Sequence, residues 1–301
     1  MNRIKQLYQN IRNIQVPFQE NEKSIQDLKI LTAKMLIGNL KNAKTLHEAE
    51  FKVFSQWGDD GIIQYLLQKV PVQNKVFVEF GVENYTEANT RFLLINNNWK
   101  GLVMDGSEEH INYIQNDPIY WRYGLKAKSA FITAENINGL ITGEGIAGNI
   151  GILSIDIDGN DYWVWKSMNA VDADIVIAEY NSLWGSERPV TIPYDPSFER
   201  TKAHYSNLYY GTSLTSLCDI ANEKGYCFIG CNSSGNNAYF VKKEKMTNLK
   251  PLSASEGFVE ANFKESRDHS GALTFLSGPK RLEALKGKEV FNTRTNLKEP
   301  I

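Results

Sequence analysis

The sequence between residues 76 and 81 reads Val76-Phe77-Val78-Glu79-Phe80-Gly81, an apolar run of strand length that ends in a carboxylate and a glycine. A helical pattern follows at residues 87–96, and a second apolar run covers residues 101–105. Parallel strands are joined by such helices, because the connection must carry the chain back to the start of the next strand. Residues 76–105 therefore predict an α/β fold.

The same alternation continues toward the C-terminus. Further strands, most of them separated by helical segments, are expected at residues 129–133, 150–157, 174–178, 226–230 and 238–242. A short turn separates the last two, which suits an antiparallel hairpin. The sequence predicts a doubly wound, mostly parallel seven-stranded sheet with an antiparallel last strand and helices on both faces.

The flanking segments do not follow this pattern. Residues 1–50 are expected to form a helical N-terminal extension, with Ile4, Leu7, Tyr8 and Ile11 at helical spacing. The sheet domain is expected to cover residues 51–244 and to be followed by a C-terminal extension, residues 245–301. We expect the terminal extensions to pack on the core or to form a homo-oligomer contact, with membrane-surface binding by the first as the alternative.

Charge is distributed unevenly over a chain that is almost neutral as a whole. The 33 Lys and Arg against 35 Asp and Glu give a net charge of −2. The net charge is +3 in residues 1–50, −9 in residues 51–241 and +4 in residues 242–301. A nucleic-acid partner is not expected, because such proteins usually carry a strongly basic surface. The acidic middle is where a functional site is expected.

Localisation is expected to be cytoplasmic. The chain starts with a polar, charged segment unlike a secretory signal, and no apolar run approaches the ~20 residues of a membrane-spanning helix. The three cysteines, Cys218, Cys227 and Cys231, include no CxxC pair, so neither a zinc site nor a disulfide framework is predicted.

Carboxylates end four of the predicted strands: Glu79, Asp105, Asp156 and Glu179. Ligands of parallel sheets bind beyond the carboxyl ends of the strands, so these four side chains are expected on one rim. Like charges at one edge repel each other and cost stability. The arrangement predicts a polar ligand or a cation between them.

The spacing points to a nucleoside cofactor. Asp105 lies 24 residues after Gly81 and ends the next strand, where an acid typically accepts hydrogen bonds from ribose hydroxyls. The loop after Gly81 lacks the GxGxxG glycines that a dinucleotide pyrophosphate needs, and it carries the acidic Glu83. Such acids suit a cofactor with an ammonium group and a sulfonium, which describes S-adenosylmethionine.

These motifs resemble the FkbM-like branch of class I S-adenosylmethionine-dependent methyltransferases. The similarity rests on the order and placement of four motifs, with an upstream element similar to SQ-x-G-x-D; they are residues 77–81, 101–107, 153–162, 177–181 and 55–61. The resemblance covers roughly residues 51–242. It implies that Asp105 holds the ribose and that Asp156 faces the reactive end of the cofactor. The cofactor-binding residues it implies are Gln56, Glu79, Gly81, Asn84, Tyr85, Thr86, Asn89, Asp105, Gly106, Ser107, Phe131, Thr133 and Asp156.

A magnesium ion is a further expectation at the ends of the fourth and fifth strands. Asp156, Asp158, Glu179 and Asn181 offer hard oxygen ligands from neighbouring strand ends. Such a cation would hold a vicinal diol and lower the pKa of its hydroxyls, as the resemblance to metal-dependent O-methyltransferases also suggests. The alternative is that Asp158 and Asp161 cap the following helix.

An insert, residues 182–213, is long for a connection in such a fold and is interpreted as a substrate lid. Its aromatic side chains suit a sugar, or they form a satellite hydrophobic cluster. His204 and Asp158 are the candidates for the base that removes the acceptor proton, with Asp156 beside them as a catalytic residue. A surface histidine is the alternative for His204.

Methyl transfer from S-adenosylmethionine to a hydroxyl of a sugar or glycan is therefore the predicted reaction. Two alternatives stand beside it. A nucleotide-sugar or NAD-dependent enzyme on the same plan is disfavoured by the missing glycine-rich loop. A non-catalytic scaffold is disfavoured by the carboxylates at all four strand ends.

Overall fold

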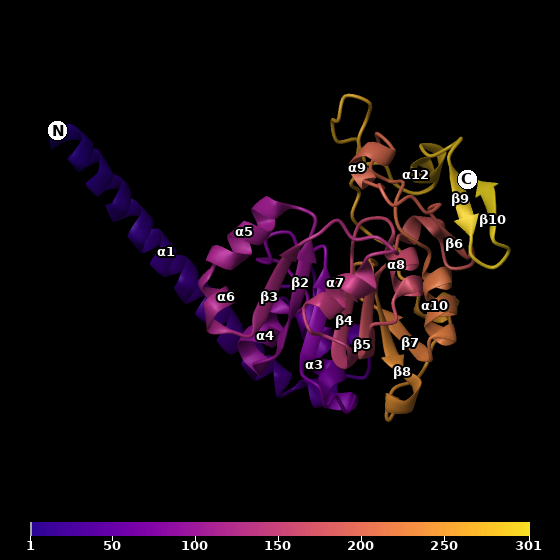
Figure 1. Ribbon diagram of the computed structural model, residues 1–301, viewed down its shortest axis with the longest axis horizontal. Coiled ribbons are helices and arrows are strands. Elements are labelled where there is room, and N and C mark those ends of the chain that lie inside the picture. Colours follow the sequence, from indigo (N-terminus) through magenta and orange to yellow (C-terminus); the bar gives the residue numbers. More distant parts are fainter. Residues whose placement is uncertain (1) are drawn as a thin grey trace.

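The structure is a computed structural model that describes the backbone of residues 2–301 and the side chains of residues 20–301. Its centre is a seven-stranded sheet in the order β3-β2-β1-β4-β5-β8-β7 (Figure 1). The strands are β1 (Val76–Phe80), β2 (Lys100–Asp105), β3 (Leu125–Ser129), β4 (Gly148–Ile155), β5 (Val171–Glu179), β7 (Tyr226–Cys231) and β8 (Asn237–Lys242).

Strand directions match the expectation from sequence. The five strands from β3 to β5 are parallel, and β8 lies antiparallel between β5 and β7. This confirms the predicted doubly wound, Rossmann-like fold, with a mostly parallel sheet and an antiparallel last strand.

The third strand lies earlier in the chain than predicted, at Leu125–Ser129 instead of residues 129–133. Lys126 and Lys128 hide it in the sequence, because they interrupt the apolar pattern by which a strand is recognised. They are tolerated because β3 is an edge strand that pairs only with β2.

Alternating residues of each strand supply two separate cores. Val78, Leu153 and Val176 belong to one cluster, and Phe77 and Ile175 belong to the other. The first is covered by α7 (Ile137–Gly143), α8 (Asp161–Ser167) and α10 (Leu214–Glu223), and the second by α3 (Asp59–Lys69), α4 (Arg91–Asn97), α5 (Glu108–Asn116) and α6 (Pro118–Arg122). Strands buried on both faces explain the near-continuous apolar runs of the sequence.

The N-terminal extension is helical, as predicted. It consists of α1 (Asn2–Ile37), the short helix η1 (Leu40–Asn42) and α2 (Leu46–Ala49). Figure 1 shows α1 leaving the domain, with the N-terminus at its far end. The predicted apolar positions Ile4, Leu7, Tyr8 and Ile11 lie outside the residues whose side chains are described. Among the described residues, no helix combines the length and the hydropathy that a membrane crossing requires.

The insert and the C-terminal segment together form a small second sheet. Strand β6 (Val190–Thr191) of the insert pairs with β9 (Glu289–Asn292), which pairs with β10 (Leu297–Pro300). The remaining short helices are η2 (Ser182–Trp184), α9 (Arg200–Ala203), η3 (Lys243–Lys245), α11 (Ala254–Gly257) and α12 (Pro279–Glu283). Trp184, Leu208 and Leu285 pack in one buried cluster, so residues 276–301 hold the insert in place.

Candidate functional site

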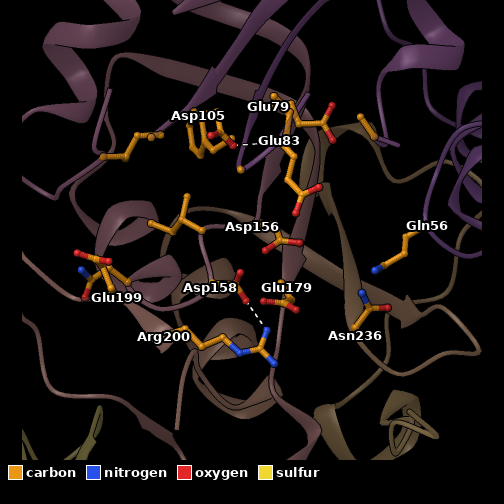
Figure 2. A pocket seen from close by; sticks show the side chains of 18 of the residues that line it. Gln56, Glu79, Glu83, Asp105, Asp156, Asp158, Glu179, Glu199, Arg200 and Asn236 are labelled. Carbon is orange, nitrogen blue, oxygen red and sulfur yellow. Dashed lines mark hydrogen bonds and ion pairs between the residues drawn. The ribbon is translucent and has the colours of Figure 1, made fainter. Parts of the chain in front are cut away.

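A cavity of about 640 Å³ opens at the carboxyl ends of the parallel strands. Residues from the ends of β1, β2, β4 and β5 line it, together with residues of the insert and of the C-terminal segment (Figure 2). Its wall is strongly acidic, with one arginine against nine carboxylates: Glu79, Glu83, Glu87, Asp105, Asp156, Asp158, Glu179, Glu199 and Glu265.

Gly81 and Asp105 shape the part of the cavity after β1 and β2. Gly81 has a φ of +65°, and its backbone lies against the end of β4, where an added Cβ would come within 1.7 Å of the Asp156 carbonyl oxygen. The Asp105 carboxylate accepts hydrogen bonds from the backbone N–H of Glu83 and of Ser107, both at 2.8 Å. These bonds hold the carboxylate in one orientation at the edge of the cavity.

Glu79 organises the loop that follows β1. Its carboxylate accepts hydrogen bonds from the backbone N–H of Asn89 at 2.8 Å and of Thr90 at 3.0 Å, and from the Thr90 hydroxyl. Burial raises the pKa of Glu79 to about 7 despite these donors. Glu79 therefore anchors residues 89–90, which lead into α4, at the same time as it lines the cavity.

Three carboxylates come together at the ends of β4 and β5. Oxygens of Asp156, Asp158 and Glu179 lie within 4.8 Å of one another. Burial raises the pKa of Asp156 well above its usual range, and the nearby Asp158 carboxylate raises it further. Burial also raises the pKa of Glu179 well above its usual range, and the Asp156 carboxylate adds to that shift. Repulsion of this kind is relieved by a proton or a cation between the oxygens.

Arg200 is the cationic group of the cavity, and the sequence analysis missed it. Its guanidinium donates to an Asp158 oxygen at 2.6 Å and to a Glu265 oxygen at 3.3 Å, and it stacks 3.8 Å from the centroid of the Tyr210 ring. Figure 2 shows the ion pair with Asp158. No sequence motif marks Arg200 or Glu265, because both lie in segments without a periodic pattern.

The structure places eight of the predicted cofactor residues in the wall of the cavity. They are Gln56, Glu79, Gly81, Asn89, Asp105, Gly106, Phe131 and Asp156. Asp158 and Glu179, from the predicted metal site, also line it. They converge because the parallel strands end at the same edge of the sheet.

Five other predicted cofactor residues do not line the cavity. Tyr85 is fully buried in the core, where its hydroxyl pairs with that of Thr90. The Asn84 side chain accepts hydrogen bonds from Thr86, so the two stabilise their own turn. Ser107 caps α5, and Thr133 pairs with Asn136 before α7.

Asn181 and His204 also lie outside the wall of the cavity. The Asn181 amide donates to the carbonyls of Leu208 and Tyr210, and its side-chain oxygen accepts from the backbone N–H of Leu183. The Asn181 side chain thus fixes the backbone of the insert, and it is not part of the cluster formed by the three carboxylates. His204 does not line the cavity; its ring packs on Tyr205 and its Nδ1 contacts the Ser206 hydroxyl.

Neither Asp158 nor Asp161 caps the following helix, because α8 begins without a side-chain cap hydrogen bond, and the Asp161 carboxylate instead holds the loop before it. Asp161 accepts hydrogen bonds from the backbone N–H of Ile157 and Gly159, at 2.8 and 3.0 Å. Asp158 has a φ of +56°. Its side chain is more than half exposed to solvent and forms an ion pair with the Arg200 guanidinium. The lid aromatics are mostly packing residues: of those in the insert, only Phe198 lines the cavity.

Neither a protein-family model nor a curated protein sequence matches this chain. The solved N-terminal domain of EvdMO1 with SAH bound is similar in structure, with a TM-score of 0.41 and 11% identity over 69% of this chain and 94% of that one. A S-adenosylmethionine-dependent methyltransferase from Clostridium acetobutylicum gives a TM-score of 0.31 and 16% identity, over 46% and 56% of the two chains. The CurJ carbon methyltransferase gives 0.40 and 10%, over 63% and 56%. At these TM-scores and identities the matches assign no role to any residue, so the residue roles rest on the geometry above.

Proposed function

We propose that this protein binds S-adenosylmethionine and transfers its methyl group to a hydroxyl of a sugar or glycan acceptor. The observation that carries the proposal is the Asp105 carboxylate at the end of β2, held by two backbone N–H groups beside the close approach of Gly81 to β4. A carboxylate fixed in this position suits the two hydroxyls of a ribose. The acidic wall suits a cofactor that carries an ammonium group and a sulfonium.

The acceptor would lie on the side of the cavity formed by β5, the insert and the C-terminal segment. Carboxylates and amides in this wall can hydrogen-bond a polyhydroxylated molecule; they include Asp158, Glu199, Asn207, Asn236 and Glu265. The sulfonium of the bound cofactor supplies an activated methyl group. What remains for the protein is to orient the acceptor hydroxyl and to take its proton, for which Asp156 and Asp158 stand at the strand end.

A divalent cation such as Mg²⁺ fits the three carboxylates at the ends of β4 and β5. Among the described residues, no amide, hydroxyl or ammonium group donates a hydrogen bond to the side chain of Asp156 or Glu179, so their oxygens are available as hard ligands. When bound, a cation at this place would lower the pKa of an acceptor hydroxyl. Arg200 competes with it, because its guanidinium already neutralises Asp158.

Binding of S-adenosylhomocysteine tests the cofactor assignment. We expect it to raise the melting temperature of the protein, while NAD and UDP-glucose do not. Asp105→Ala should weaken S-adenosylhomocysteine about 10- to 100-fold, because two charge-assisted hydrogen bonds are lost. Calorimetric titration measures the affinity. Asp105→Asn, which keeps one acceptor oxygen, should lie between the two, and Glu109→Ala on the exposed face of α5 is the control. Stabilisation by NAD alone, or wild-type affinity of Asp105→Ala, contradicts the assignment.

Titration with Mg²⁺ tests the cation assignment separately. Glu179→Gln should lower the Mg²⁺ affinity at least about tenfold, because one anionic ligand of three is lost. Glu199→Gln is the matched control, since Glu199 lines the same cavity outside the group of three. Arg200→Met should raise the affinity by freeing Asp158. Equal Mg²⁺ binding by wild type and Glu179→Gln would show that the three carboxylates hold no cation.

A further inference from the structure

A second cavity, of about 610 Å³, adjoins the proposed catalytic cavity. It lies between residues 50–58, Ser233-Ser234 and Asn262-Phe263. Gln56 lines both cavities. Figure 2 shows its side chain at the edge of the catalytic cavity, beside Asn236 and apart from the carboxylates. We call this second space the Trp57 cavity, after its largest exposed side chain.

Two aromatic rings form one wall of the Trp57 cavity. The Trp57 and Phe263 ring centroids are 6.2 Å apart and their planes differ by only 15°. Trp57 is 39% exposed. The rest of the fold leaves part of the Trp57 side chain uncovered, with the Phe263 ring beside it.

Some polar side chains at the rim of the Trp57 cavity already form hydrogen bonds within the protein, and others do not. Glu50 accepts hydrogen bonds from Ser233, and Lys52 donates to the Gln56 carbonyl and to Glu87. The side-chain amides of Gln56 and Asn262 make no hydrogen bond to any described residue. A free amide offers a donor and an acceptor together, which is what a hydroxyl group needs from a partner.

We propose that the Trp57 cavity is a sugar subsite that binds a second unit of an oligosaccharide acceptor. A pyranose ring has an apolar face that stacks on aromatic rings and a rim of hydroxyls that amides recognise. Because Gln56 lies in both walls, a chain can extend from the catalytic cavity into this one. The identity of the acceptor rests on the proposed function, and the occupancy of the cavity by a sugar can be tested without turnover.

Binding of the full-length protein to a printed glycan array, with S-adenosylhomocysteine present, tests the subsite. We expect wild type to bind oligosaccharides and Trp57→Ala to bind them about tenfold more weakly, since one stacking contact is lost. Trp121→Ala is the matched control, because Trp121 on α6 is more exposed still and lines neither cavity. Phe263→Ala should repeat the loss if the Trp57 variant folds poorly.

The glycan array tests the sugar subsite, and the affinity for S-adenosylhomocysteine tests the proposed function separately. If Trp57→Ala binds oligosaccharides as wild type does, or if wild type binds none, the subsite is wrong. The affinity for S-adenosylhomocysteine, measured on the same preparations, should be equal in wild type and Trp57→Ala. If S-adenosylhomocysteine does not bind at all, the proposed function fails, while the array still decides what occupies the Trp57 cavity.

A different surface, on α1, carries a second inference that is independent of the first. Five large apolar side chains on this helix are between 40 and 71% exposed: Ile25, Leu28, Leu31, Met35 and Leu36. Ala33, Ile30 and Ile37 face the domain instead and pack near Phe54 and Phe92. The positions 25, 28 and 35, with Thr32 between them, follow the three-and-four spacing of a helix that packs on another helix.

Charge on α1 identifies the partner helix. Residues 20–28 carry Glu20, Glu22, Lys23 and Asp27, a net of −2, and residues 29–37 carry Lys29 and Lys34, a net of +2. A second copy of the helix laid antiparallel brings each half against its opposite charge, whereas a parallel copy brings like charges together. We infer that residues 20–37 form an antiparallel helix pair between two copies of this chain.

Light scattering after size-exclusion chromatography tests the pairing. We expect wild type at twice the mass of one chain and Leu28→Glu at the mass of a single chain, because a charge replaces a central apolar contact. Lys23→Glu, on the side of the helix away from the stripe, should remain a dimer. The single variants Glu22→Lys and Lys34→Glu should weaken the dimer, and the double variant should restore it only in the antiparallel arrangement, which brings these two positions opposite each other. A monomeric wild type, including one that binds anionic vesicles instead, would overturn the inference.

Discussion

Gly81→Ala is expected to leave little folded protein, while Gly106→Ala folds as wild type does. At Gly81 the backbone φ of +65° is one that alanine adopts only with strain, and the added Cβ would lie 1.7 Å from the Asp156 carbonyl oxygen. Neither backbone can move easily, because the Gly81 N–H donates to Met104 of β2 and Asp156 directly follows β4. Strain and overlap together should cost about 3–5 kcal/mol, which is a large part of the stability of an ordinary domain.

Chemical denaturation of the two variants measures this difference. Gly106 is a matched control because it lines the same cavity, has no positive φ, and would bring its Cβ only to 3.9 Å from a Phe131 ring carbon. Equal unfolding free energies for Gly81→Ala and Gly106→Ala would mean that the close approach of the β1 loop to β4 is not required. The cavity would then be less narrowly defined than the structure indicates.

The strand-end carboxylates could be placed from sequence because parallel strands share one carboxyl edge. Glu79, Asp105, Asp156 and Glu179 each follow an apolar run, and a correct alternation of strands and helices brings all four to one cavity without further information. The same logic located Gly81. It did not require side-chain detail, since the register of the strands alone decides where their ends meet.

The rest of the site depends on backbone turns and on long-range contacts. Tyr85 follows Gly81 closely in sequence, yet it has a φ of +62°, and its ring turns into the core instead of the cavity. Arg200 and Glu265 reach the cavity through the pairing of the insert with the C-terminal segment, which joins residues about a hundred positions apart. No periodic pattern records such a pairing, so the arginine that neutralises Asp158 could not be foreseen.

Glu79 should make the protein less stable as the pH rises, whereas an acid in a salt bridge makes a protein more stable as the pH rises. Burial raises the pKa of Glu79 from 4.5 to about 7 in the folded protein. The folded state therefore binds the proton more tightly than the unfolded chain does. This contribution to stability is fully present below pH 4.5 and is lost as the pH rises through about 7.

The comparison with Glu79→Gln isolates this effect, because glutamine cannot ionise. The unfolding free energy of wild type relative to Glu79→Gln is expected to fall by about 3 kcal/mol in total as the pH rises from below 4.5 to above 7, as a shift of this size implies. Denaturant titrations across that range measure it. Asp60 and Asp161, whose pKa values burial raises to about 6, are present in both proteins, so their titration cancels in the difference. A difference that stays constant with pH would mean that the donors from Asn89 and Thr90 offset the burial of the Glu79 carboxylate. Glu79 would then bind its proton equally tightly in the folded and the unfolded state.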